Sequence, residues 1–153
     1  MDMTCTFFGH RGTPPEIKNL LRQVISELIE KQGVKRFFVG NQGNFDAMTR
    51  SLLAEFEQTH LIRYEIVLAY LPKKEGLHSA ADHTILPEGI ETVPPRFAIE
   101  YRNKWMIDHS DIVVTYVTRI TGGAVKFKDI AIKRKKAIVE LSEVYCTSRP
   151  VGL

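Results

Sequence analysis

Residues 37–46 read Phe37-Phe38-Val39-Gly40-Asn41-Gln42-Gly43-Asn44-Phe45-Asp46, a short apolar run followed by glycines and asparagines. The apolar run is typical of a β-strand, and apolar residues then recur at spacings of three and four up to Phe56, as on one face of a helix. Glycine lets the backbone turn sharply and approach a ligand closely, and Asn44 is suited to cap the helix. The stretch therefore predicts a strand, a tight turn and a helix whose free amides form an anion-binding cradle. The alternative is an ordinary strand-to-helix connection that needs its glycines only for the turn.

Two further junctions have the same character. A predicted strand at 4–8 ends in Gly9-His10-Arg11-Gly12, and Thr13-Pro14-Pro15-Glu16 then forms a capping box that predicts a helix. That helix is expected to have Thr13 as its N-cap and Pro14 as its first residue, and to end before Gly33. A nearly continuous apolar strand at 111–117 precedes Thr121-Gly122-Gly123, where another helix is predicted to begin and to run to about residue 134.

The remaining elements complete an alternation of strands and helices. Strands are predicted at 36–39, 64–71 and 137–141, and a helix at 96–109. Residues 73–95 have no regular period, which predicts a lid or binding loop, with a disordered excursion as the alternative. Strands that alternate with helices indicate an α/β fold with a parallel sheet. Since right-handed crossovers bring the loops after parallel strands to one edge, the three glycine-bearing junctions are expected to converge there.

Composition narrows the class of protein. A chain of 153 residues with 44% apolar and 25% charged residues is expected to form a single globular domain, 1–153, in the cytoplasm. The formal charge of +3 is small, and the basic cluster from Lys126 to Lys136 is interpreted as a solvated helix face, so nucleic acid is not an expected partner. Neither a signal peptide nor a membrane-spanning stretch is expected.

The sequence predicts neither a disulfide framework nor a metal site. Cys5 and Cys146 are the two cysteines, and they form no CxxC pair. The residues His78, Asp82 and His83 match no common metal-ligand spacing and no cysteine accompanies them. No cofactor is expected to be required.

Four segments resemble known proteins: CTFFGHR at 5–11, GNQGNFD at 40–46, YRNKWMIDHSD at 101–111 and GGA at 122–124. They resemble the SLOG superfamily, which unites the DNA-processing Smf/DprA proteins with the LOG, or lysine decarboxylase-like, phosphoribohydrolases. The chain is most similar to the YpsA-like branch. The resemblance covers nearly the whole chain and implies a Rossmann-like three-layer sandwich with a parallel sheet of about five strands in the order 3-2-1-4-5. It also implies a nucleotide or nucleoside phosphate as ligand and a homo-oligomer, such as a dimer.

LOG enzymes cleave the N-glycosidic bond of nucleoside monophosphates with an arginine and the glutamate of a PGGxGTxxE motif. By that resemblance Arg102 stands at the position of the arginine, Gly122 and Gly123 match two glycines, and Asp129 takes the place of the glutamate. Thr121, Val125 and Lys126 depart from the motif, and an aspartate is one methylene shorter than a glutamate. If the chain is an N-glycosidic-bond hydrolase, Arg102 and Asp129 are the expected catalytic residues.

The leading interpretation is a domain that binds a nucleoside phosphate or an ADP-ribose-like ligand at the carboxyl edge of the sheet, with a sensor as the role that this binding suggests. The expected ligand-binding residues are Gly9, His10, Arg11, Gly40, Asn41, Gly43, Asn44, Asp46, Arg102, Asn103, Thr121, Gly122 and Gly123. A LOG-like phosphoribohydrolase is the first alternative. A DprA-like module that binds single-stranded DNA is the second.

Overall fold

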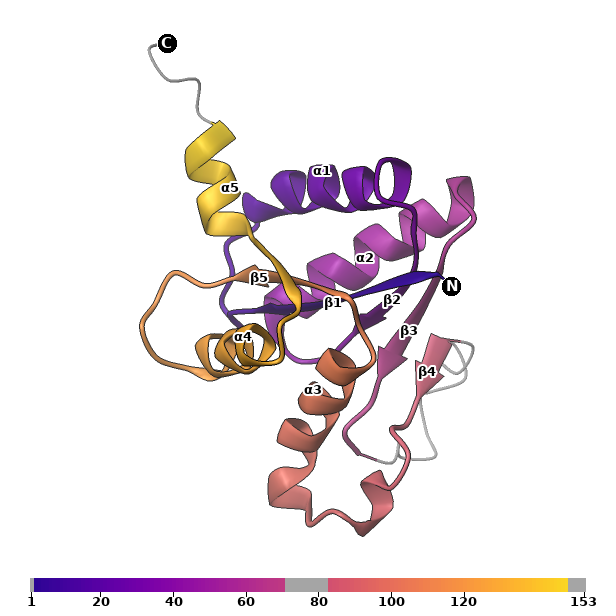
Figure 1. The fold of residues 1–153 in the computed structure, drawn as a ribbon, viewed down its shortest axis with the longest axis vertical. Coiled ribbons are helices and arrows are strands. Elements are labelled where there is room, and N and C mark those ends of the chain that lie inside the picture. Colours follow the sequence, from indigo (N-terminus) through magenta and orange to yellow (C-terminus); the bar gives the residue numbers. More distant parts are fainter. Residues whose placement is uncertain (1, 71–82, 149–153) are drawn as a thin grey trace.

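The structure, a computed structural model, describes residues 2–70 and 83–148. Strands and helices alternate along the chain (Figure 1). The elements are β1 (Met3–Gly9), α1 (Ile17–Glu30), β2 (Val34–Val39), α2 (Gly43–Thr59), β3 (Arg63–Val67), β4 (Thr84–Ile85), the 3-10 helices η2 (Ile90–Thr92) and η3 (Pro95–Phe97), α3 (Ala98–Asp108), β5 (Ile112–Tyr116), α4 (Gly123–Lys133), β6 (Ala137–Glu140) and α5 (Leu141–Ser148).

Six parallel strands form one sheet in the order β4-β3-β2-β1-β5-β6. The five predicted strands correspond to β1, β2, β3, β5 and β6, and their arrangement confirms the 3-2-1-4-5 order. The strand predicted at 64–71 corresponds to β3, which is shorter and ends at Val67. The fold is therefore the Rossmann-like α/β sandwich that the sequence predicted, with one additional edge strand.

The additional strand corrects the prediction that 73–95 has no regular structure. β4 pairs with β3, and the Leu68 amide donates to the Ile85 carbonyl at 2.9 Å. Ile90 in η2 is buried with Ala69 and Ala98, so this segment packs against the start of α3. Residues 73–82, and with them much of the predicted lid, lie outside the described residues.

Helices cover both faces of the sheet. α1 and α2 pack on one face and α3 and α4 on the other (Figure 1). Successive side chains of a strand point to opposite faces, so Phe7 and Phe37 enter the core under α1 and α2, whereas Phe8 and Phe38 enter the core under α3 and α4. Full burial of each such side chain contributes about 1.5–3 kcal/mol to stability. The described helices are all too short or too polar to cross a bilayer.

Two predicted helix caps are wrong. Helix α1 begins at Ile17 rather than at Pro14, and its N-cap is Glu16 rather than Thr13. The Thr13 hydroxyl and amide both donate to the His10 carbonyl, at 2.5 and 3.1 Å, and close a turn before the helix. Asn44 does not cap α2 with its side chain. Its backbone amide instead donates to the Arg11 carbonyl at 2.8 Å, so the loop after β1 satisfies the start of α2.

Candidate functional site

A cavity of about 370 Å³ opens at the carboxyl edge of the sheet. It lies where the loops after β1 and β5 meet helix α3 and the N-terminus of α4. Its lining includes Phe7, Phe8, Gly9, His10, Arg11, Gly12, Gln42, Asp46, Ile99, Arg102, Asn103, Met106, Arg119, Thr121, Gly122, Gly123, Ala124 and Phe127. Segments far apart in the sequence therefore converge on one rim, as expected for an open α/β sheet.

Three glycines of the first two junctions, Gly9, Gly40 and Gly43, make room for other parts of the protein, whereas Gly12 faces open space. A Cβ on Gly9 would lie 2.3 Å from the Phe45 ring, and a Cβ on Gly40 would lie 2.7 Å from an Asp46 carboxylate oxygen. Gly43 has a φ of +85° and its Cβ would lie 2.6 Å from the Arg11 Cα, so loop and helix cross there in contact. These three glycines are explained by packing between segments, without a ligand.

The predicted anion cradle at Gly40–Asn44 is wrong for two of its amides. The Gln42 amide donates to Asp46 Oδ2 at 2.9 Å, and the Asn44 amide donates to the Arg11 carbonyl. Both donors are already paired within the chain. The alternative of an ordinary strand-to-helix connection accounts for these two hydrogen bonds, and a binding role for the rest of the junction stays a prediction.

The junction after β5 differs, because its glycines face open space. Apart from adjoining residues and the helix's own backbone, no atom of the described residues lies within 4 Å of a Cβ built on Gly122 or Gly123. Gly122 has φ +116° and ψ 175°, a conformation essentially restricted to glycine. The first backbone hydrogen bond at this end of α4 runs from the Lys126 amide to the Gly122 carbonyl, so the amides of the first turn have no acceptor within the helix. This end of α4 can accept an anion.

Arg119 supplies a cation next to these amides. It is exposed, lines the cavity, and has no hydrogen-bond or carboxylate partner among the described residues. Arg11 is the second cation at the rim, and its Nη2 donates to the neutral Gln42 Oε1 at 2.7 Å. Neither charge is neutralised by an ion pair within the described chain. The cavity is therefore suited to an anionic guest.

Arg102 has a structural environment that the sequence did not predict. Only 2% of it is exposed, and its guanidinium donates to Asn103 Oδ1 at 2.7 Å, to the Val67 carbonyl at 2.8 Å and to Asn41 Oδ1 at 3.2 Å. Burial lowers the pKa of Arg102, and the Asp46 carboxylate acts in the opposite direction. Arg102 thus joins α3 to the ends of β2 and β3 through Nε and Nη1, and its Nη2 group donates to no acceptor among the described residues.

Asp46 and Asn103 complete the inner wall. Burial raises the pKa of Asp46, while the Gln42 amide and the arginines Arg102, Arg50 and Arg11 act to lower it. Asn103 is 8% exposed, and its amide nitrogen has no acceptor in the described part of the chain. An unpaired donor in the cavity lining is available to a polar ligand atom.

The structure thus separates the predicted site residues into two groups. Those in the cavity lining are Gly9, His10, Arg11, Asp46, Arg102, Asn103, Thr121, Gly122 and Gly123, whereas Gly40, Asn41, Gly43 and Asn44 lie outside it. Asp129, the predicted catalytic carboxylate, also lies outside and is exposed. It follows Phe127 by two positions, which turns it away from the face that Phe127 buries.

Sequence reasoning missed nine lining residues: Phe7, Phe8, Gly12, Gln42, Ile99, Met106, Arg119, Ala124 and Phe127. Arg119 had a usable signal, since it lies between a predicted apolar strand and the glycines that begin the next helix. Gln42 had none, because no local pattern indicates its hydrogen bond with Arg11, a residue distant in the sequence.

Among known proteins, no family model matches the chain, and no curated protein does. The fold is similar to that in the X-ray structure of DNA processing protein A (DprA) from Streptococcus pneumoniae, with a TM-score of 0.70 and 11% sequence identity over 91% of this chain and 50% of that one. The chain therefore spans about half the length of that protein. At this identity the likeness shows the fold alone, so membership of the SLOG superfamily stays a prediction from the sequence segments. Placement in the YpsA-like branch stays a prediction.

Proposed function

We propose that the protein binds a small phosphate-bearing ligand of nucleotide type in the cavity at the carboxyl edge of the sheet. The observation that carries this proposal is the pairing of an uncompensated Arg119 with the open Gly122-Gly123 start of α4. A phosphate there accepts hydrogen bonds from backbone amides and from a guanidinium. The apolar wall of Ile99 and Met106 is suited to the less polar part of the same molecule.

Thermal stability measured with adenosine 5′-monophosphate, ADP-ribose and NAD tests the proposal. A ligand present at 100 times its Kd stabilises the fold by about 2.7 kcal/mol, which raises the Tm of a chain this size by roughly 5–10 °C. Arg119→Ala is expected to weaken binding about ten- to hundredfold, because it removes a charge-assisted contact. Arg63→Ala is the matched control, since Arg63 is also exposed but begins β3 at the opposite edge. Equal binding by both variants, or no stabilisation by any of the three ligands, overturns the proposal.

Binding is proposed without hydrolysis, since Asp129 does not line the cavity. Asp46 is the acidic residue of the described lining, and one of its oxygens already accepts the Gln42 amide. Incubation with nucleoside monophosphates is therefore expected to release no free base. Release of base that Asp46→Asn abolishes would favour the phosphoribohydrolase alternative.

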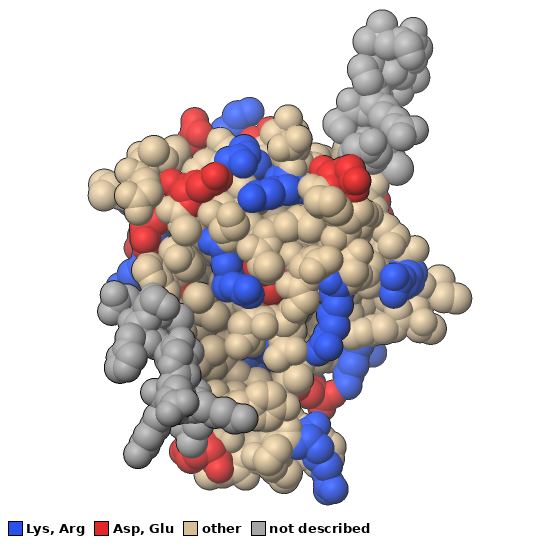
Figure 2. Space-filling model, turned by 180° about the vertical axis from the view of Figure 1, so that it is seen from behind, with Lys and Arg blue, Asp and Glu red and all other residues tan. Residues whose placement is uncertain are grey.

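Single-stranded DNA is the second candidate ligand, because the structural neighbour is a DNA processing protein. On the face drawn in Figure 2, however, lysines and arginines are dispersed among acidic side chains rather than gathered in one patch. Binding to DNA would depend steeply on salt, since each contacted phosphate releases counterions. Affinity for an oligonucleotide that falls steeply as salt is raised would favour this candidate over the small ligand.

A further inference from the structure

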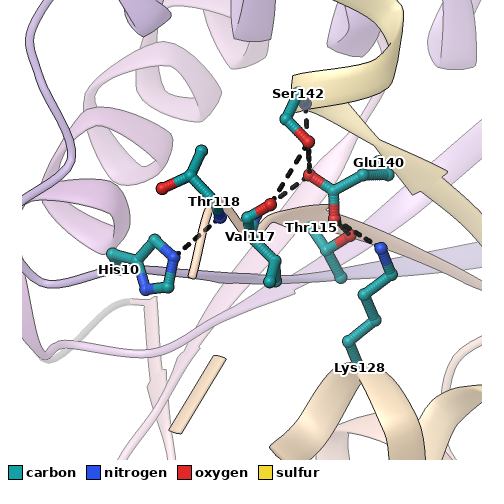
Figure 3. Close-up of polar contacts among 7 residues, drawn as sticks. All are labelled: His10, Thr115, Val117, Thr118, Lys128, Glu140 and Ser142. Atoms are coloured by element: carbon teal, nitrogen blue, oxygen red, sulfur yellow. Dashed lines mark hydrogen bonds and ion pairs between the residues drawn. The ribbon is translucent and has the colours of Figure 1, made fainter. Parts of the chain in front are cut away.

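The loop between β5 and α4, residues 117–122, is held by one side chain from β6 and one from the residue after β1 (Figure 3). The Val117 amide donates to Glu140 Oε2 at 2.9 Å, and the Thr118 amide donates to His10 Nε2 at 3.0 Å. Glu140 ends β6, whereas His10 directly follows β1. The amides of two consecutive loop residues, immediately before Arg119, thus donate to side chains that lie on opposite sides of the loop (Figure 3).

The side chains of Glu140 and His10 differ in how securely each remains a hydrogen-bond acceptor. Glu140 also accepts from Thr115, Lys128 and Ser142, so its acceptor role is secured by several donors. His10 can accept from Thr118 only while Nε2 carries no proton. Protonation of His10 Nε2 therefore breaks the hydrogen bond with the Thr118 amide, one of the two hydrogen bonds by which the loop amides are held.

The charged and titratable groups that face His10 come from three elements. Arg119 lies on the loop itself, Glu140 on β6, and the Tyr116 ring of β5 meets the imidazole edge to face at 6.2 Å. Burial, and then Arg119, lower the pKa of His10, while Glu140 acts in the opposite direction. Neutral imidazole, the form that accepts the Thr118 amide, is thus favoured in the unliganded site.

We propose that His10 is a proton-sensitive positioning residue of the anion-binding loop: neutral His10 fixes the backbone that presents Arg119 and the Gly122-Gly123 amides, and protonated His10 releases it. This inference rests on the proposed function, because it concerns the loop of that same site. His10 acts through Thr118 rather than through the ligand. Protonation both removes the acceptor and places a second cation beside Arg119.

The unliganded loop gives the direct test. In ¹⁵N–¹H spectra the Thr118 amide resonance is expected to shift with the same midpoint as the His10 ring, and Thr118 hydrogen exchange to accelerate below that midpoint. His10→Gln keeps a side-chain acceptor that does not titrate, so both changes are expected to disappear in it. His109→Gln is the matched control, since His109 directly follows α3 and its ring contacts the Trp105 carbonyl outside the cavity lining. A Thr118 amide that does not titrate in the native chain overturns the inference.

Sulfate binding at pH 8 links the loop to the site. Sulfate is used because it carries the same charge at pH 8 and at lower pH. At pH 8 His10 is neutral, so the measurement reports the loop and not an added positive charge on His10. His10→Leu removes the acceptor and is expected to weaken sulfate binding about fivefold, the equivalent of one ordinary hydrogen bond, while His10→Gln restores it. Sulfate binding that is unchanged in His10→Leu overturns this inference but leaves the proposed function intact. No sulfate binding by the native chain overturns the anion site itself, and with it the proposed role of the loop.

Discussion

Replacement of Glu140 by glutamine tests whether the buried carboxylate organises the carboxyl edge of the sheet. Glu140 is 5% exposed and accepts hydrogen bonds from the Thr115 hydroxyl, the Lys128 ammonium, the Val117 amide and both donors of Ser142 (Figure 3). Glutamine keeps the shape but removes the charge. The glutamine NH2 group would also replace one acceptor oxygen, so its hydrogens would face the donors that now bond to that oxygen.

The expected loss follows from the surroundings of Lys128. Removal of one partner of a buried ion pair costs about 3–5 kcal/mol, because the other charge is left uncompensated. The Lys128 side chain retains 20% exposure, so water relieves part of that cost. Glu140→Gln is therefore expected to lower the free energy of unfolding by about 2–4 kcal/mol, a large share of the 5–15 kcal/mol typical of a domain.

Urea unfolding measures this difference, and a second substitution identifies its cause. In the Glu140→Gln background, Lys128→Met removes the uncompensated cation and is expected to recover part of the stability, with a coupling of about 1–3 kcal/mol. Glu55→Gln is the control, because Glu55 forms an exposed pair with Arg22 that is worth about 0–1 kcal/mol. A loss in Glu140→Gln no larger than in Glu55→Gln would refute the reasoning.

Acid unfolding gives an independent check. Burial by itself raises the pKa of Glu140, but the hydrogen bonds led by Lys128 outweigh it and hold the pKa below the ordinary value of 4.5. A carboxyl group whose pKa is lower in the folded state contributes stability above pH 4.5 and loses it as the pH falls through the folded value. The native protein is thus expected to lose stability more steeply below pH 4.5 than Glu140→Gln. Parallel profiles would contradict the assignment.

Further predictions concern backbone and site residues. Gly43→Ala is expected to cost well over 2 kcal/mol by thermal unfolding, because positive φ and the approach to Arg11 both oppose a Cβ, whereas Gly33→Ala, with positive φ but open space, costs about 1–2 kcal/mol. Arg102→Lys is expected to lower stability by about 2–4 kcal/mol in urea, since an ammonium group cannot reproduce its three hydrogen bonds, and an unchanged midpoint would contradict a structural role. Asp129→Asn is expected to change neither stability nor nucleotide affinity, and a loss of affinity by calorimetry would return Asp129 to the site.

The sequence by itself determined the alternation of strands and helices and the edge at which the loops converge. Both follow from patterns among residues that are close in the sequence. The periods of two and 3.6 residues are set by backbone geometry, so they are read from neighbouring residues without knowledge of the fold. Parallel strands with right-handed crossovers then leave one arrangement for the loops that follow β1, β2 and β5.

Only the tertiary structure decided which residues of those loops face the cavity. Gly43 and Gly122 look alike in sequence, yet Gly43 abuts Arg11 and Gly122 faces open space. Arg102 reads as a surface arginine of a helix, but the ends of two strands surround it. The physical reason is that burial and hydrogen-bond partnership depend on contacts between segments distant in sequence, which no local period encodes.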